Sequence, residues 1–358
     1  MDKTQKKKHS RRKERKRRSA AQGHQAHIRP FPGPRPPEAY PQPLDAIVLA
    51  GTDGNPHRLI AGRNKAFLDM GGRSLVRITV EALLKAHAVD RVFVVGPVED
   101  LERELNDLSS RVRTVPQVGK MLRNAWAGVR AAQRPRAAAG GEGEVAERPV
   151  LLLPCDMPLI SAQAVDDFIA RCAREDRQCA EGHYALLVGA VEEQSVLRYC
   201  PRKGEPGILR PFVDLRSERL RLANIYVVRP QELGGHELVE TGFSYRKAKD
   251  WRNVIALAWS LISRPGGWKA AWLVLRLQAT VMAAKRKGRL YRWLRRGNTQ
   301  EALEAGGSTL LGGSIRFVVS PYGGLSIDVD DQEDYLIIGS RFAEWSSWSH
   351  DQDSAILA

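Results

Sequence analysis

Three short motifs contain the residues whose types and spacing suggest chemistry. A glycine-rich loop, LAGTDGNPHRL, follows an apolar run, and Lys65 lies fourteen residues after Gly51. Asp156 follows another apolar run in PCDMP, and Asp330 stands in DVDDQEDY. Glycine lets the backbone come close to a ligand, and loop amides suit phosphate oxygens. Carboxylates and phosphates together supply the oxygen ligands that Mg²⁺ prefers. The set therefore favours a phosphorylated ligand and Mg²⁺, with Asp156 and Asp330 as metal ligands.

The same sequence lacks two familiar phosphate motifs and a visible general base. The loop matches neither GxGxxG nor GxxxxGK[ST], so the Rossmann and P-loop motifs are both absent. The eight histidines form no cluster with Ser or Asp. A phosphate nucleophile needs no such base, because its second pKa is about 6 and it is already ionised near neutral pH. Chemistry at a phosphate would then depend on positioning and charge neutralisation.

The elements that must position these residues alternate between strand and helix. Apolar runs predict strands at 45–50, 91–96 and 149–158, and RVRTV predicts another at 111–115. Helical spacing predicts helices at 73–88, 98–108, 121–133 and 161–173, the last with Ser161 as its N-cap. This alternation predicts a parallel α/β sheet. Ligands bind at the carboxyl ends of the strands in such sheets, so we expect Gly51 and Asp156 at one edge.

The second half of the chain is less regular. Strands are expected at 183–191, 208–215, 221–230, 314–320 and 325–330, some of them antiparallel. Asp330 would then end a strand and face Asp156. A helix over 331–345 closes the pattern, with acidic residues in its first turn, as the helix dipole favours. Residues 346–358 are predicted to be a flexible end.

Charge is spread unevenly along the 358 residues. The net charge is +15, of which 1–44 contribute +10 and 246–296 contribute +13, which leaves −8 for the remainder. This distribution indicates a mildly acidic globular protein with two basic attachments, and argues against a uniformly basic nucleic-acid binder. No run of 18 apolar residues and no CxxC spacing occurs. We therefore expect reduced thiols and a cytoplasmic location.

Each basic attachment has two interpretations. Residues 1–44 join a Lys/Arg run to a Pro-rich stretch and are predicted to be disordered. This tail would either contact nucleic acid or lipid without specificity, or serve only to keep the protein in solution. Residues 246–296 are helical in pattern and hold five of the eight tryptophans. They could contact anionic lipid peripherally on the inner membrane face, or cover the sheet as a helical cap. The cap is favoured, because a hydrophobic stripe at helical spacing is usually core.

The motifs in this order resemble the MobA-like nucleotidyltransferases, which are related to sugar-nucleotide pyrophosphorylases and molybdenum-cofactor guanylyltransferase. The resemblance rests on DAIVLAGTDG, NKAFLDMGGRSLV, LLLPCDMPLI and SIDVDDQEDYLIIGSRF, and covers about 45–345. It implies one domain over 45–345 with a three-layer, mixed, mostly parallel sheet of the GT-A-like type. Residues 246–296 would be a helical insertion in that domain.

The resemblance also implies a reaction and a role for each matching residue. An NMP would pass from an NTP to a phosphorylated small-molecule or lipid-linked acceptor, with Mg²⁺ bound and pyrophosphate released. Lys65 would touch the α-phosphate, and Asp156 and Asp330 would bind Mg²⁺. The remaining implied contacts are with the nucleotide (Gly51, Gly54 and Asn124), the pyrophosphate (Arg58, at a shifted spacing) and the acceptor (Asn224). Thr52 stands where the family pattern has a second glycine.

Two alternatives stay open at the level of sequence. A GT-A-type glycosyltransferase would use a DxD motif, and Asp328-Val329-Asp330 has that form, although later in the chain than expected. A degenerate nucleotide-binding or RNA-associated protein would explain Thr52 and the basic tail. Pyrophosphate release from an NTP separates the transferase from the glycosyltransferase, and the intact set of Lys65, Asp156 and Asp330 argues against the degenerate binder.

Overall fold

Four parallel strands form the first half of the sheet. The computed structural model describes residues 40–52, 59–133, 148–234, 267–284 and 288–357. Strand β1 (Leu44–Leu49) pairs in parallel with β2 (Val89–Gly96) and β4 (Val150–Pro154), and β2 pairs with β3 (Val112–Pro116). The predicted parallel strands are thus confirmed. Ala46, Ile47 and Val48 of β1 are all fully buried, so both faces of this strand are covered.

Helices connect these strands where the sequence predicted them. They are α2 (Leu75–Lys85), α3 (Val98–Leu105), α4 (Met121–Ala132) and α5 (Ala162–Gln178). The Ser161 hydroxyl accepts a hydrogen bond from the Ala164 amide at 3.2 Å, which confirms the predicted N-cap of α5. Gly128 of α4 lies against Ile47, where an added Cβ would be 2.4 Å from the Ile47 Cγ2. Helix α4 therefore packs closely on the sheet.

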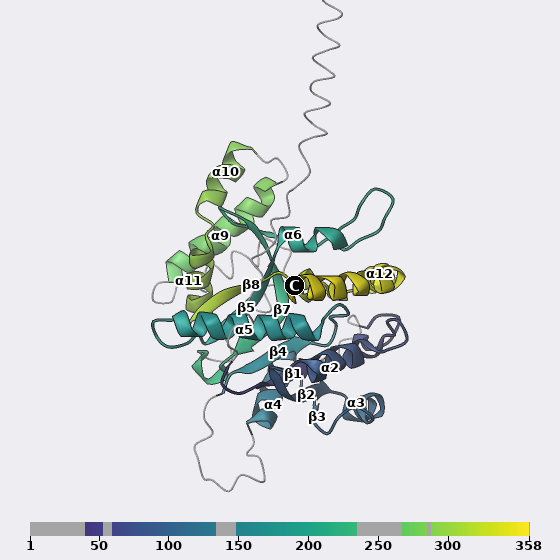
Figure 1. The fold of residues 1–358 in the computed structure, drawn as a ribbon. Coiled ribbons are helices and arrows are strands. Elements are labelled where there is room, and N and C mark those ends of the chain that lie inside the picture. The colour runs from purple at the N-terminus through teal and green to yellow at the C-terminus, as the bar shows by residue number, and fades with distance from the viewer. Residues whose placement is uncertain (1–39, 53–58, 134–147, 235–266, 285–287, 358) are drawn as a thin grey trace, which may run out of the picture. The chain divides into compact units, whose positions relative to one another are not determined.

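An antiparallel strand separates the two halves of the sheet. Strand β7 (Arg219–Val228) lies between β4 and β5 (Leu186–Glu192) and runs antiparallel to both. Strand β8 (Ile315–Ser320) pairs in parallel with β5, and the short β6 (Val213–Asp214) pairs with β7. The order is β3-β2-β1-β4-β7-β5-β8, with β6 beside β7 (Figure 1). This is the predicted mixed, mostly parallel α/β fold.

The second half adds short and long helices around the sheet. The α-helices are α6 (Glu193–Val196), α9 (Gly267–Ala284), α10 (Arg289–Arg296), α11 (Gln300–Leu311) and α12 (Gln332–Leu357). Single 3₁₀ turns are η2 (Lys65–Phe67), η3 (Leu197–Tyr199), η4 (Pro230–Glu232) and η5 (Gly323–Ser326). Leu303 of α11 packs against a buried cluster formed by Ala190, Leu215 and Leu220. None of the described helices is long and apolar enough to cross a membrane.

Three predictions in the second half were wrong. Residues 325–330 are not a strand: η5 leads into an extended segment, because Gly323 and Gly324 pack against the backbone of α6 and Leu159, where a Cβ would lie 2.0 and 2.7 Å away. Asp330 therefore does not end a strand. Of 208–215, only Val213–Asp214 pair in the sheet. The closing helix continues to Leu357, so residues 346–357 are helical rather than a flexible end.

Two predicted regions lie wholly or partly outside the described residues. These are the basic tail, of which 1–39 are outside, and the segment 246–296, of which 246–266 and 285–287 are outside. The described part of 246–296 is helical, as predicted, and forms α9 and α10.

Candidate active site

Lys65 is aimed at the end of β4 by its neighbour Asn64. The Asn64 side chain caps η2 by accepting from the Ala66 amide at 3.0 Å, and its Nδ2 donates to the Ala50 carbonyl at 2.9 Å. This pair of bonds ties η2 to the residue that follows β1. The Lys65 ammonium then reaches Asp156, with which it forms a hydrogen-bonded ion pair, and donates to the Val329 carbonyl at 3.3 Å.

Asp156 is held from three sides. Its neighbour Cys155 continues the β1–β4 pairing by donating to the Leu49 carbonyl at 3.1 Å, and the Thr79 hydroxyl of α2 donates to the Cys155 carbonyl at 3.1 Å. The Val329 amide donates to the Asp156 carbonyl at 3.0 Å. Although Asp156 follows the last residue of a strand, it is only 3% exposed. This burial arises because the segment around Val329 crosses over the end of β4.

One oxygen of Asp156 has no partner. Lys65 takes Oδ2, whereas Oδ1 is buried and accepts no hydrogen bond from the described residues. A buried polar atom without a partner is costly, and in native structures it is rare enough to need an explanation. A ligand or a cation that is added to this position would satisfy it.

The ammonium of Lys65 stays charged in this setting. Burial by itself would lower the pKa of Lys65, but the charge and hydrogen bond of Asp156, together with the charge of Asp330, raise it above the ordinary lysine value. Lys65, Asp156 and Asp330 therefore belong to one electrostatic cluster, although Asp330 is 58% exposed and makes its own ion pair elsewhere.

A third carboxylate, that of Asp328, belongs to this cluster. Burial and the charges of Asp330 and Asp156 raise the pKa of Asp328 to about 6. Asn224 of β7 donates to the Asp328 carboxylate at 2.8 Å, so the predicted acceptor-side amide is bonded to an acid here. Sequence reasoning used Asp328 only as part of a DxD motif. The spacing of Asp328 and Asp330 could have predicted that Asp328 belongs to the site, because residues i and i+2 of an extended segment point the same way.

Arg210 holds the acidic segment together and was not predicted. Its guanidinium donates to both oxygens of Asp334, at 3.1 Å for one of them, and to the Asp328 carbonyl at 3.3 Å. It also lies 3.3 Å from the Asp330 carboxylate. Asp330 is anchored further by its amide, which donates to Asp334 at 2.9 Å. One arginine thus positions three acids at the start of α12.

The glycine loop is braced by amide side chains. A Cβ at Gly51 would lie 2.8 Å from both Asn124 Nδ2 and Gln117 Oε1, so any side chain there would force these two amides to shift. Gln117 accepts from the Thr52 amide at 3.3 Å and was not predicted. Asn124 is buried, accepts from Val118 at 2.7 Å and donates to Gly119 at 3.0 Å, so it supports the loop over 117–119. Gly54 and Arg58 lie outside the described residues.

A buried arginine completes this part of the molecule. Arg221 of β7 is 4% exposed, and its Nη1 has no hydrogen-bond partner among the described residues. Burial lowers the pKa of Arg221 to about 10, while the charge of Asp328 opposes that shift. The acidic cluster is therefore bordered by a cation that is not fully paired.

The cluster suits a cation only in combination with other ligands. Within the described ranges, no group of three or more His, Cys, Asp or Glu side chains is spaced to hold a metal ion. The Asp156 oxygen that has no partner among the described residues, and the burial and carboxylate repulsion that raise the Asp328 pKa, nevertheless favour added positive charge. Mg²⁺ that also binds phosphate oxygens would need only one or two protein carboxylates.

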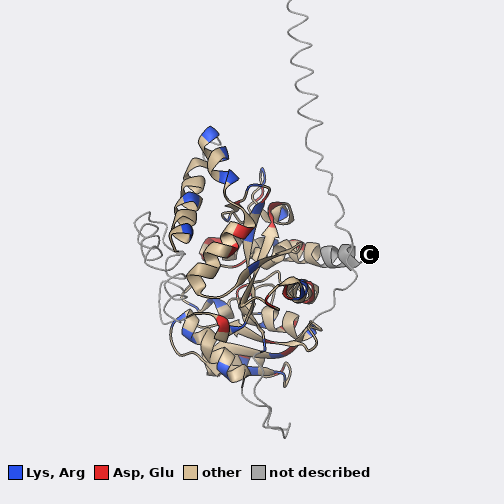
Figure 2. Ribbon diagram, turned by 90° about the vertical axis from the view of Figure 1, so that its left-hand side faces the viewer, with Lys and Arg blue, Asp and Glu red and all other residues tan. Residues whose placement is uncertain are grey.

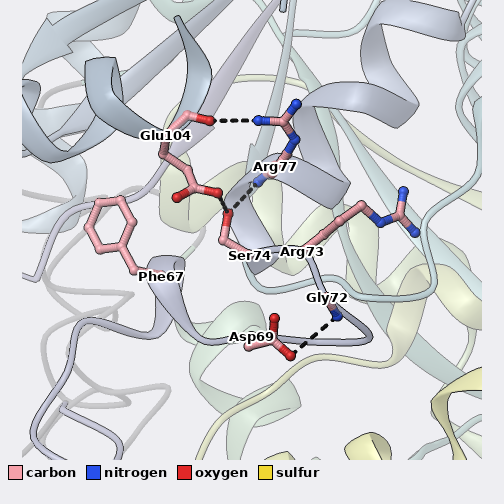
Figure 3. Close-up of a pocket in the computed structure, with 7 residues that line it drawn as sticks. All are labelled: Phe67, Asp69, Gly72, Arg73, Ser74, Arg77 and Glu104. Carbon is pink, nitrogen blue, oxygen red and sulfur yellow. Dashed lines mark hydrogen bonds between the residues drawn. The ribbon is translucent and has the colours of Figure 1, made fainter. Parts of the chain in front are cut away.

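A separate hollow of about 340 Å³ lies beside the start of α2 (Figure 3). Its polar groups already bond to one another: the Ser74 hydroxyl donates to Glu104 at 2.7 Å, and Arg77 donates to the Glu104 carbonyl at 3.0 Å. It contains none of the clustered acids, so we place no reaction there.

A family model for the MobA-like NTP transferase domain matches residues 46–243. The chain therefore belongs to this family, and its class is that of the nucleotidyltransferases. Among curated proteins it is similar to the 2-C-methyl-D-erythritol 4-phosphate cytidylyltransferase of Rhodococcus jostii, with 40% identity over 73 residues, or 20% of this chain. That match spans 31% of the relative's length.

Solved structures of transferases are also similar. A hypothetical transferase from Thermus thermophilus is 23% identical with a TM-score of 0.48, covering 82% of this chain and 100% of that one. The 4-diphosphocytidyl-2C-methyl-D-erythritol synthase of Anaerococcus prevotii is 12% identical with a TM-score of 0.41, covering 84% of this chain and 96% of that one.

Proposed function

We propose that this protein transfers an NMP from an NTP to a phosphorylated acceptor and releases pyrophosphate, with Mg²⁺ bound. The observation that carries the proposal is the pair of Lys65 and Asp156 beside the glycine loop, with one buried Asp156 oxygen that has no partner among the described residues. A cation, an anion-binding loop and an unsatisfied carboxylate are the parts that phosphoryl chemistry needs.

The reaction would need charge placement rather than a base. An ionised oxygen of the acceptor phosphate attacks the α-phosphorus of the NTP, and the bond from that phosphorus to the bridging oxygen breaks. Pyrophosphate leaves with the electron pair of that bond. Lys65 would hold an α-phosphate oxygen, and the backbone around Gly51 would approach the nucleotide. Because the nucleophile is already ionised, no protein group has to remove a proton.

Asp156 and Asp330 would hold Mg²⁺, with Asp328 as the buried neighbour that shares their charge. When bound, the ion would neutralise and orient the triphosphate. Asn224 and Arg210 would act on the acceptor side by fixing Asp328 and the start of α12. The acceptor would be anionic, since the incompletely paired Arg221 borders this region. Whether it is a small molecule or a lipid-linked phosphate follows from the screen below.

The test is a pyrophosphate-release screen of the four NTPs against sugar, polyol and lipid-head phosphates, with Mg²⁺ or with EDTA. We expect release with one NTP and one acceptor class, dependent on Mg²⁺ and lost in Lys65→Ala. Transfer from an NDP-sugar without pyrophosphate would instead support the glycosyltransferase. NTP binding without any product, unchanged in Lys65→Ala, would support the degenerate binder. Either of these results would overturn the proposal.

A further inference from the structure

Helices α9 and α10 have a buried face that fixes them to the rest of the protein. Ala270 and Ala271 of α9 are each 2% exposed and pack with Val274 and with Leu310 of α11. Gly306 of α11 lies so close to α9 that a Cβ there would be 2.5 Å from the Leu273 side chain. This apolar face is therefore buried against α11, which itself packs on the sheet.

Polar contacts lock the two helices to each other and to the edge of the sheet. Arg276 of α9 donates to the Asn298 side chain at 2.9 Å, and Asn298, which is fully buried, donates to Thr280 at 3.0 Å. Arg295 of α10 donates to the Leu215 carbonyl just after β6. The orientation of both helices is therefore set, and with it the direction of their outer faces.

The outer faces carry large apolar side chains. Trp268, Trp272, Leu275 and Met282 recur at helical spacing on α9, and the two tryptophans are 62% and 52% exposed. On α10, Leu290 and Trp293 are 62% and 60% exposed. We call these six residues the α9–α10 surface. Among the described residues, every tryptophan that is mostly exposed lies on it.

The surroundings of this surface are strongly basic. Residues 267–296 contain nine Lys and Arg and no Asp or Glu. Arg289, Arg292 and Arg296 are exposed on α10, beside Leu290 and Trp293. Figure 2 shows blue and no red along these helices. A protein partner would have to supply all the acidic groups itself, whereas an anionic bilayer supplies a uniform negative plane.

We infer that the α9–α10 surface binds the face of an anionic lipid bilayer. Tryptophan prefers the headgroup layer, where its ring is buried and its N–H stays in a polar region, while arginine pairs with lipid phosphates. The helices lie along the interface and do not span it. The cap and the membrane contact, which sequence reasoning set against each other, are then the inner and outer faces of the same helices.

Tryptophan quenching by brominated lipid tests this contact in the full-length protein. The tail over 1–44 contains no tryptophan, so any lipid contact that it makes does not quench. We expect quenching and co-sedimentation with phosphatidylcholine–phosphatidylglycerol vesicles, weakened by high salt, and little of either with phosphatidylcholine alone. Equal binding to both vesicle types would overturn the inference.

Two triple variants separate burial from fluorescence. Replacing Trp268, Trp272 and Trp293 by Ser should lower vesicle affinity about ten-fold or more, because binding scales with buried apolar area. Replacing the same three by Phe should keep the affinity within about three-fold, because Phe retains an apolar ring, while most of the quenching is lost. A matched control, Leu197→Ser with Leu336→Ser, removes exposed apolar side chains elsewhere and should bind as wild type.

Three outcomes contradict this assignment. Unchanged binding of the Ser variant would remove the surface from the contact, and quenching that persists in the Phe variant would assign it to one of the five remaining tryptophans. The third outcome is measured by sedimentation velocity. If the wild type is a dimer and the Ser variant is a monomer, the surface is a contact between copies of this chain. Circular dichroism of all variants should match wild type, since the substituted side chains are exposed.

Discussion

The two halves of the sheet position their polar side chains by different means. In the parallel half, hydrogen bonds between side-chain amides and the backbone do so: Asn64 fixes Lys65, Gln117 braces Thr52 beside Gly51, and Asn124 supports the loop over 117–119. In the half beyond β4, a network of charges does so, with Arg210 joined to Asp328, Asp330 and Asp334. Backbone-centred bonds hold one geometry, whereas a charge network depends on every member and on pH.

The pairing of β7 with β5 is also less regular than the pairing of the parallel strands. Its pairing with β5 shifts register between Val188 and Ala190, and a Cβ at Gly189 would lie 2.7 Å from Ile225. Glycine at this point lets β7 bulge, and a bulge re-aims the side chains near it. Asn224 lies in this stretch and bonds to Asp328. In the second half, the side chain of Asn224 thus lies where the strand pairing is irregular.

The largest effect should come from the parallel half. Lys65→Ala removes the cation that pairs with Asp156 and should lower kcat/KM by roughly 10²–10³-fold, since one preorganised charge contact is worth a few kcal/mol. Lys65→Arg, which keeps the charge but changes the geometry, is the comparison. Steady-state pyrophosphate release measures both. A loss in Lys65→Ala of less than about three-fold would contradict a role at the α-phosphate.

Breaking the charge network should lower the stability of the protein more than its affinity for NTP. Arg210→Gln leaves Asp328 and Asp334 mostly buried without their cation, which should cost about 3 kcal/mol of unfolding free energy. NTP affinity should change little, because the loop at Gly51 is braced independently. Urea unfolding and isothermal titration measure the two quantities. If NTP affinity falls as much as stability, the two halves are not independent.

A smaller effect is expected where the parallel half is tightest. Gly51→Ala would place a methyl group 2.8 Å from Asn124 and Gln117, so both amides must shift. NTP affinity should fall about ten-fold, because the loop backbone can no longer approach the ligand as closely. Thr52→Gly, which changes the neighbouring residue without adding bulk, serves as the control and should bind NTP within about three-fold of wild type.

The smallest effect is expected for Asp328→Asn, which should raise the free energy of unfolding measured in EDTA. The pKa of Asp328 is raised to about 6, so the folded protein binds more protons than the unfolded one between about pH 4 and 6, and stability falls as pH rises through that window. Asp328→Asn removes this cost and should add about 1–2 kcal/mol at pH 7.5, after the lost Arg210 contact is subtracted. At pH 4 the gain should vanish. A variant that is less stable at both pH values would mean that the contacts of Asp328 outweigh its burial.

Much of the parallel half could be predicted because its signals are local. Strands β1, β2 and β4 contain short apolar runs, each helix has an apolar stripe, and Ser161 marks a helix start. Such patterns reflect the burial of neighbouring residues, so the sequence alone was enough to predict the element order and to place Gly51 and Asp156 at one edge of the sheet.

Only the tertiary structure decided the rest. Arg210 lies 124 residues before Asp334, and no periodicity records which distant carboxylates one guanidinium will join. The burial of Asp156, the non-strand path of 327–330 and the shared charge of Asp328 all depend on a segment that crosses the end of β4. The outward direction of Trp268 and Trp272 likewise depends on which face of α9 meets α11. Local hydrophobic pattern sets which residues form an element, whereas long-range packing and charge pairing set what each polar side chain meets.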